Sequence, residues 1–323
     1  MGEPAVESTW RKLPAMCALA ASLAFAVMLG IRPLSSPDIG YHLAYGQEFL
    51  RTGKLVDHND YVFLGNEAAA TRAEPGPGCW YDADGHYRFP NANWLTQVIL
   101  AAIYQAFGFM GLCVLQALLT AGAFAAAVVA MRRLGLGWLA VAVGVLLIAL
   151  ASYERLVLRP EMLSYLLLAI QLAILMPAYP RFLETLARNP SKPDTPAPPL
   201  GTRALAAVVV VQLLMSNLHS YFLLGLVTTG ALFGDAILRM AWARITHAPV
   251  APSLKPWTQR LAILLGLQIA VCFANPWTWR MVLLPFQTLL FLREHDVGQE
   301  MTTLGYPCVE ETSNPVYRMF LQS

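Results

Sequence analysis

Charged residues are scarce in this chain of 323 residues, of which Asp, Glu, Lys and Arg make up 13% and hydrophobic residues 57%. A soluble domain carries about 25% charged residues, so the composition excludes an ordinary soluble globular protein. It predicts an all-α polytopic membrane protein with about seven transmembrane helices, since each span needs about 20 residues.

Cysteine is also scarce, and the five cysteines show no spacing typical of a metal site. Cys17, Cys113 and Cys272 fall in apolar segments, where cysteine usually acts as a small hydrophobic residue. Cys79 and Cys308 fall in loops on the same predicted side of the membrane. Two interpretations stay open for them: a disulfide bond, or two free thiols.

The N-terminal part predicts a retained membrane anchor. Residues 1–12 form a short N-terminus ending in Arg11 and Lys12, and residues 13–34 contain the first transmembrane helix, with the uncharged run Leu13–Ile31. A signal peptide has the same order of basic and apolar residues. Because no small-residue cleavage site follows the run, we interpret it as a helix that stays in the membrane.

Residues 35–111 predict a large outer loop with interfacial helices. The segment from Asp38 to Gly53 has the pattern of an amphipathic helix, and Glu74–Asn93 is rich in turn residues that predict either a folded lid or a disordered loop. The apolar run Trp94–Phe107 is too short to span and is broken at Gly108–Gly111, which favours a helix at the membrane interface.

Transmembrane helices two to seven are expected within residues 112–276. The run Ala204–Phe233 has no charged residue and would form a helix about 45 Å long, too long for a hydrocarbon core of about 30 Å. We therefore expect it to turn at Ser216–Ser220. Residues 277–323 should form an outer interfacial segment, with Met281–Leu292 along the surface. The chain stops where an eighth span could begin, and three interpretations stay open: a fragment, a truncated paralogue, or a core module that needs a partner.

The distribution of charge predicts the orientation. In this topology the N-terminal side receives 12 of the 22 Lys and Arg residues but only five of the 20 acidic residues. Basic residues are enriched in cytoplasmic loops, so we expect a multi-pass protein of the cytoplasmic (inner) membrane with a cytoplasmic N-terminus.

Four polar clusters then fall on the non-cytoplasmic side, where they outline a candidate site. Polar groups at membrane depth are costly, and they usually face a cavity or a partner. The candidate residues are Asp38, Tyr41, His42, Trp94, Arg155, Arg159, Asn217 and His219.

The chemistry of each cluster leaves alternatives open. Asp38 and His42 share one helical face and could act as a general base, bind a metal or form a simple hydrogen-bonded pair. Arg155 and Arg159 fit either membrane anchors or phosphate ligands. Asn217 and His219 suit a hydrogen-bonded turn as well as a site.

A resemblance joins these clusters. Asp38-x-x-x-His42-Leu43-x-x-Gly46, then Gly53-Lys54-Leu55-Val56-Asp57-His58-Asn59-Asp60, Asn93-Trp94-Leu95 and Gly108–Leu112 occur in that order, followed by Arg159-Pro160, Asn217-x-His219 and Asn275-Pro276. This series resembles a bacterial multi-spanning family similar to the GT-C class of membrane glycosyltransferases, which includes protein O-mannosyltransferases and lipid A aminoarabinose transferases. Val56 and Ser220 depart from the family pattern, which more often has proline and glycine there.

The resemblance implies a GT-C-like core and an inverting glycosyltransferase that uses a polyprenyl-phosphate sugar on the non-cytoplasmic side. It implies that Asp38 is the catalytic base and that Arg159 binds the phosphate of the donor. Some class members use a divalent metal and others do not, so the cofactor and any metal ligands stay unknown.

Two other functions compete with this one. The chain could be a non-catalytic GT-C-like scaffold or a subunit of a larger complex, or it could handle or transport lipids. The sequence shows no internal repeat and no charge buried mid-span, which disfavours a transporter. The partners that we expect are membrane lipid, the polyprenyl-phosphate sugar and an unknown acceptor, with a protein partner if the chain is a core module, and no nucleic acid.

Overall fold

The computed structural model describes residues 12–34, 36, 38–58, 75–176, 200–248, 250 and 254–294, with side chains to residue 291. Apart from one small hairpin, the regular elements of this part of the chain are helices. They are α2 (Leu13–Gly30), α3 (Ile39–Thr52), α4 (Trp94–Arg133), α5 (Trp138–Ala151), η2 (Tyr153–Arg155), α6 (Pro160–Leu175), α8 (Thr202–Leu218), α9 (Phe222–Ile245), α10 (Leu254–Val271) and α11 (Trp279–Glu294).

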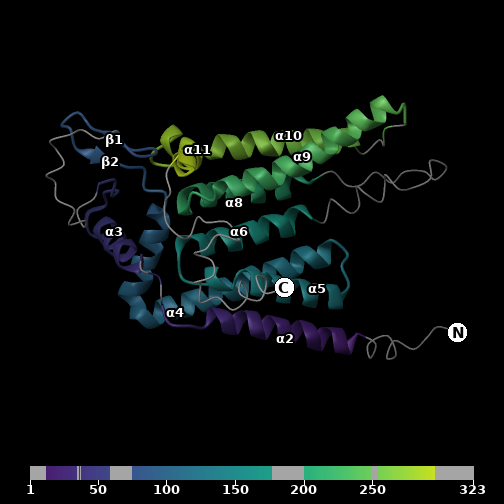
Figure 1. Cartoon of the computed structure of the whole chain (residues 1–323), viewed down its shortest axis with the longest axis horizontal. Coiled ribbons are helices and arrows are strands. Elements are labelled where there is room, and N and C mark those ends of the chain that lie inside the picture. Colours follow the sequence, from purple (N-terminus) through teal and green to yellow (C-terminus); the bar gives the residue numbers. More distant parts are fainter. Residues whose placement is uncertain are drawn as a thin grey trace.

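Most of the helices run lengthwise beside one another and form a bundle, while α3, the hairpin and the first part of α4 gather at one end (Figure 1). Within the bundle, α2 packs on α5 and α4, α4 packs on α6, and α8 packs on α6 and α10. We call the end that holds α3 the α3 end.

The composition of the helices agrees with a helical membrane protein. Three of them, α2, α4 and α9, are long and apolar enough to cross a membrane, and α5, α6, α8 and the Trp279–Phe291 part of α11 are shorter apolar helices. The expected number of seven spans stays a prediction, because helix length and composition support three of them directly.

The predicted break after Phe107 is confirmed. The backbone leaves the helical region at Gly108, with φ 61° and ψ −157°, inside the 40 residues of α4. Glycine adopts such a positive φ without a steric penalty. The first part of α4 therefore stays at the α3 end, and the second part turns into the bundle (Figure 1).

The predicted break in the second long apolar run is also confirmed, but the ends of the helices differ. Helix α8 ends at Leu218, His219 has extended backbone, and α9 begins at Phe222. Helix α9 continues past Phe233 to Ile245, and within this extension Arg239 Nε lies 2.8 Å from Asp235 Oδ2, an i,i+4 ion pair that favours the helix. Helix α10 likewise begins at Leu254, earlier than the uncharged run that starts at Leu261.

Helix α3 is the amphipathic helix that the sequence predicts. It ends at Gly53, whose φ of 70° lets its N–H donate to the Phe49 carbonyl at 2.8 Å. One face packs on α4, and the other carries an exposed ion pair between Glu48 and Arg51.

Buried amide side chains join helix ends inside the bundle. Gln116 of α4 is fully buried and donates to the Gly30 carbonyl at the end of α2 at 2.8 Å. Its oxygen accepts the N–H of Leu158 at 2.7 Å, just before α6. One glutamine thus satisfies backbone groups of two neighbouring segments that would otherwise be unpaired in an apolar environment.

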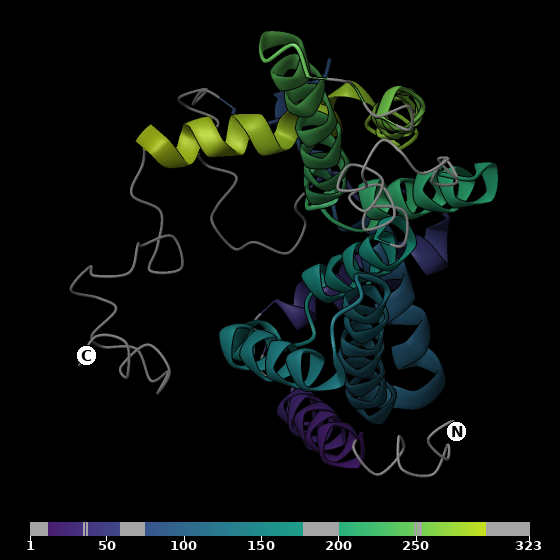
Figure 2. The same ribbon diagram turned by 90° about the vertical axis from the view of Figure 1, so that its right-hand side faces the viewer.

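Helix α11 lies across the α3 end of the bundle. It is seen nearly end-on in Figure 1 and runs across the view in Figure 2, after the turn of 90°. The interfacial position expected for this segment stays a prediction, and the helix is longer than the expected Met281–Leu292. Cys308 lies outside the described residues, so the choice between a disulfide and two free thiols stays open.

The contact between α3 and α4 gives a stability prediction at Gly46. Alanine usually stabilises a helix interior by about 1 kcal/mol relative to glycine. A Cβ atom at Gly46, however, would overlap the backbone carbonyl of Gln97 on α4. We therefore expect Gly46→Ala to destabilise the protein by about 1–3 kcal/mol and to lower the Tm measured in detergent.

The matched control is Gly40→Ala on the same helix, where an added Cβ meets nothing within 4 Å. Its Tm should be unchanged or higher. Equal Tm shifts for the two variants would contradict the close approach of α3 to α4.

Candidate functional site

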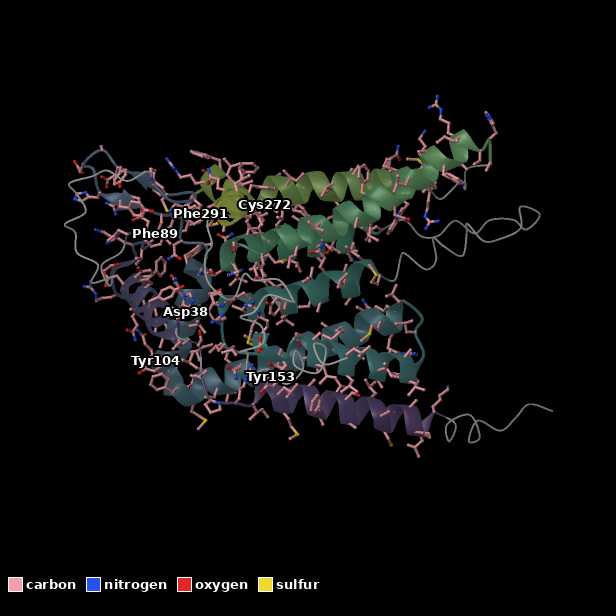
Figure 3. The ribbon with its side chains drawn as sticks, in the orientation of Figure 1. Asp38, Phe89, Tyr104, Tyr153, Cys272 and Phe291 are labelled. Carbon is pink, nitrogen blue, oxygen red and sulfur yellow. The ribbon has the colours of Figure 1, made fainter. Side chains whose placement is uncertain are left out.

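The candidate site lies at the α3 end of the bundle, where Asp38 begins α3 (Figure 3). Proline starts α6 at Pro160, and it holds the preceding Arg159 in extended backbone with φ −136° and ψ 161°. Asp38 at the start of α3 and Arg159 just before α6 thereby place a carboxylate beside a guanidinium cation.

Asp38 and Arg159 form the central contact of the site. Their closest side-chain atoms, Asp38 Oδ2 and Arg159 Nη2, are 3.9 Å apart, and the two side chains are 45% and 21% exposed. This distance is longer than a hydrogen bond, so it describes an electrostatic contact rather than a locked bidentate pair. The Asp38 carboxylate also makes no cap hydrogen bond to α3. A ligand could therefore reach it from solvent.

The simple hydrogen-bonded pair of Asp38 with His42 is not what the structure shows. His42 is only 2% exposed, and its Nδ1 lies 3.3 Å from the Gln97 amide nitrogen on α4. Because an amide nitrogen donates, Nδ1 accepts and the neutral ring carries its proton on Nε2. The packing of α3 on α4 gives His42 its partner Gln97. The spacing of residues within α3 could not predict this contact, because it shows only which residues share a face.

A chain of hydrogen bonds fixes the His42 ring from behind. Asn91, just after the hairpin, donates to Gln97 Oε1 at 2.7 Å and to the Val56 carbonyl at 3.1 Å. Gln97 in turn contacts His42. Neither Asn91 nor Gln97 was predicted from the sequence. Gln97 gave a visible signal, because it is a polar residue inside the apolar run Trp94–Phe107.

Burial makes His42 a weak base. Burial and, to a smaller extent, the positive charge of Arg159 lower the pKa of His42 from 6.5 to about 4. Burial has the same effect on His219, whose pKa is also lowered to about 4, with a contribution from His42. Both rings are therefore neutral at neutral pH, and they lie close enough for the charge of one to affect the other.

Hydrogen bonds within the protein hold the turn between α8 and α9 in place. His219 Nδ1 accepts the N–H of Tyr221 at 3.1 Å, as expected for a capped turn. Asn217 accepts a hydrogen bond from Trp94 Nε1 at 3.1 Å and donates to the Ala274 carbonyl at 3.0 Å. Trp94 and Asn217 thus join α4, α8 and the segment after α10, and neither is held by a contact with Asp38.

Tyr41 belongs to the site because the charges of neighbouring residues act on its phenol. Burial raises the pKa of its phenol, and the negative charges of Asp38 and Glu161 raise it further. The ring also contacts His42, with 4.1 Å between ring centroids. Tyr41 therefore stays a neutral hydrogen-bond donor at neutral pH.

Glu161 is a residue that the sequence analysis missed. It lies in the first turn of α6, two residues after Arg159, and its charge acts on Tyr41 as that of Asp38 does. The site thus has a second carboxylate in electrostatic reach. Arg155, by contrast, lies exposed in η2, and its described backbone bond is local, to Ser152.

The turn-rich part of the outer loop is folded within the described residues 75–93. It forms an antiparallel hairpin of β1 (Trp80–Tyr81) and β2 (Tyr87–Arg88). Arg88 joins the hairpin to the preceding segment through ion pairs with Asp82 at 2.8 Å and Asp57 at 2.9 Å. Residues 75–93 are therefore folded rather than disordered, and a lid over the site stays a prediction.

Among the described residues, one group of three side chains has the types that can bind a metal ion, and it lies in the hairpin turn. Asp82, Asp84 and His86 have ligand atoms within 4.8 Å of one another. However, the Asp82 carboxylate already accepts the backbone N–H groups of Asp84 and His86, and it pairs with Arg88. Hydrogen bonding by His86 and then by Arg88 lowers the pKa of Asp82. These contacts explain the turn without a metal.

A cavity of about 570 Å³ lies between residues 75–79 and α11. Arg280 lines it and stacks on Trp80 and Trp279, with its guanidinium carbon 4.2 and 4.7 Å from the ring centroids. The outward pocket expected around Asp38, His42, Arg159 and His219 stays a prediction. Asp38, Arg159 and Tyr41 would supply the polar groups of its wall.

Comparison with known proteins identifies no relative: no family model, no curated protein and no solved structure matches this chain.

The neutral state of His42 gives a prediction about pH. The folded pKa is about 4 and the ordinary value is 6.5, so between these values the unfolded chain binds more protons. The contribution of His42 to stability is complete above about pH 6.5 and falls as the pH decreases toward 4. The loss amounts to at most about 3 kcal/mol.

We expect His42→Gln to reduce the drop in Tm between pH 7 and pH 4, because glutamine does not titrate and can still accept a hydrogen bond from Gln97. His86→Gln, at a 70% exposed side chain, serves as control and should keep the wild-type dependence. Parallel pH profiles for wild type and His42→Gln would contradict the burial of a neutral His42.

Proposed function

We propose that the protein is a membrane glycosyltransferase of the GT-C type. It transfers a sugar from a polyprenyl-phosphate donor to an acceptor on the non-cytoplasmic side. The observation that carries the proposal is the 3.9 Å approach of Arg159 to the half-exposed Asp38, at one end of an apolar helix bundle. A carboxylate base for the acceptor and a cation for the phosphate are the two groups that this reaction requires.

Asp38 acts on the acceptor. Its carboxylate takes the proton from the acceptor hydroxyl or amine as that atom attacks the anomeric carbon of the sugar. The bond between the anomeric carbon and the phosphate oxygen breaks, and the phosphate leaves with the electron pair. One displacement of this kind inverts the anomeric configuration.

Arg159 acts on the donor. Its planar guanidinium can hold two phosphate oxygens and offsets the negative charge that develops on the leaving phosphate. Its contact with Asp38 is longer than a hydrogen bond, so the Asp38 carboxylate keeps its solvent access beside the guanidinium.

The neutral side chains beside this pair orient the sugar. Tyr41, which is 40% exposed, keeps its phenolic proton and can donate to sugar hydroxyl or phosphate oxygens, while the buried His42 ring packs against it at 4.1 Å between ring centroids. The bonded chain from Asn91 through Gln97 holds the imidazole of His42 in place.

The proposal includes an orientation in the cytoplasmic membrane, with about seven spans and the N-terminus in the cytoplasm. In a background without native cysteines, Asp84→Cys in the hairpin turn should react with an impermeant maleimide added to intact cells. Thr246→Cys, just after α9, should react only after the membrane is permeabilised. Labelling of both from outside would contradict the orientation.

The catalytic role is tested with Asp38→Asn. The amide has nearly the shape of the carboxylate but cannot take a proton, so transfer from a labelled polyprenyl-phosphate sugar should fall by a factor of about 100 or more. The matched control is Glu48→Gln on the outer face of α3, which should keep wild-type activity. Arg159→Lys should weaken the use of the donor without abolishing turnover, because lysine keeps the charge and loses the fork.

These outcomes separate an enzyme from a scaffold. Full transfer by purified Asp38→Asn protein would remove the catalytic assignment. If the wild-type protein transfers no sugar from any polyprenyl-phosphate donor, and if Asp38→Asn leaves its association with a partner protein unchanged, the scaffold interpretation replaces the enzyme.

A further inference from the structure

The segment between α5 and α6 ends at Arg159, the proposed ligand of the donor phosphate. The short turn η2 in this segment closes on a long bond, because the N–H of Leu156 reaches the Tyr153 carbonyl at 3.5 Å. A connection of this kind is mobile unless other parts of the protein hold it. Two side chains from distant parts of the sequence do so, Gln116 of α4 and Arg32 just after α2.

Gln116 holds the residue directly before Arg159. Its Oε1 accepts the N–H of Leu158 at 2.7 Å, and the Leu158 side chain is also buried. The Gln116 amide is anchored on its other side, because Nε2 donates to the Gly30 carbonyl at 2.8 Å and to the Arg32 carbonyl at 3.3 Å. Gln116 is fully buried, so these bonds are shielded from bulk water. The backbone that leads into Arg159 is therefore tied to α4 and to the end of α2.

Arg32 holds the same segment a few residues earlier. Its Nη2 donates to the Tyr153 carbonyl at 2.7 Å, and its Nε donates to the Leu156 carbonyl at 3.3 Å. Its guanidinium also lies over the Tyr153 ring, 5.1 Å from the centroid, beside the end of α2 (Figure 3). An arginine that only anchored α2 at the membrane surface would extend toward the lipid headgroups. Arg32 is instead directed onto the segment that leads to Arg159, and we call Arg32 and Gln116 together the clamp.

The clamp acts on Arg159 from one side, and α6 acts on it from the other. Pro160 is buried at the start of α6 and restricts the backbone of the residue before it. With Leu158 and Pro160 both held, the Arg159 guanidinium moves only through its own side-chain torsions, and it lies 3.9 Å from Asp38 Oδ2. A ligand group that is already in place before the substrate arrives loses less conformational entropy on binding.

We propose that Gln116 and Arg32 are positioning residues for the donor phosphate, which hold the backbone before Arg159 and thereby keep its guanidinium beside Asp38. This inference rests on the proposed glycosyl transfer. It adds that the end of the first apolar helix, α2, is mechanically part of the donor site. Both residues act through Arg159, since their side-chain bonds are made to the backbone of this protein.

The first test measures the kinetics of the full chain purified in detergent, with a labelled polyprenyl-phosphate sugar as donor. Methionine has nearly the length of glutamine but makes none of its hydrogen bonds. Gln116→Met should raise the KM for the donor about tenfold and leave the KM for the acceptor nearly unchanged. The matched control is Gln171→Met, at a second fully buried glutamine, which donates to the Gly225 carbonyl at 2.8 Å and has no bond to the segment before α6. It should lower the Tm as Gln116→Met does, but keep the wild-type KM for the donor.

A double-mutant cycle distinguishes positioning from a general loss of stability. Once Arg159→Ala has removed the guanidinium, Gln116→Met should change kcat/KM for the donor by less than about twofold. Arg32→Gln, at a half-buried residue, should raise the KM for the donor about threefold, and again only when Arg159 is present. Losses that multiply in the Arg159→Ala background would overturn the positioning role.

A measurement without substrate separates this inference from the proposed function. Gln116→Met should speed amide hydrogen exchange at Leu158 at least about tenfold, whereas Gln171→Met should leave it unchanged. Unchanged exchange in Gln116→Met would overturn the clamp, whether or not the protein transfers sugar. If Gln116→Met fails to fold, Arg32→Gln replaces it in both measurements, with exchange followed across residues 153–158.

The remaining outcomes are also decisive. Faster exchange with an unchanged KM for the donor would overturn the role in donor binding. If the wild-type protein uses no polyprenyl-phosphate donor but exchange responds as expected, the proposed function fails, and the clamp remains as a contact that only stabilises the fold.

Discussion

Every backbone polar group inside an apolar bundle needs a partner, and the arrangement of this protein depends on that constraint. The bundle meets it with buried amide side chains where helices end or break. Gln116 joins the end of α2 to the segment before α6, and Asn217 joins the turn after α8 to the segment after α10. Asn91 does the same for the segment after α3, because its amide donates to the Val56 carbonyl at 3.1 Å. Removing any of these amides would leave groups unpaired where water is scarce.

The candidate site is a consequence of this packing. Helix α3 can approach α4 closely because Gly46 has no side chain, and this approach buries His42 and leaves Asp38 at the edge. The proline at the start of α6 then directs Arg159 toward Asp38. The neutral Tyr41 and the partly exposed Asp38 and Arg159 thus lie next to one another, and this combination can bind a phosphorylated sugar and accept a proton.

The sequence by itself determined the helical class, the amphipathic α3 with its end at Gly53, the break at Gly108 and the turn near His219. These features follow from composition, periodicity and glycine, which act locally along the chain. Only the tertiary structure decided the partners: Arg159 rather than His42 for Asp38, Gln97 for His42, and Asn217 for Trp94. The spacing of residues within a helix defines its faces, but the packing of helices distant in the sequence determines what each face meets.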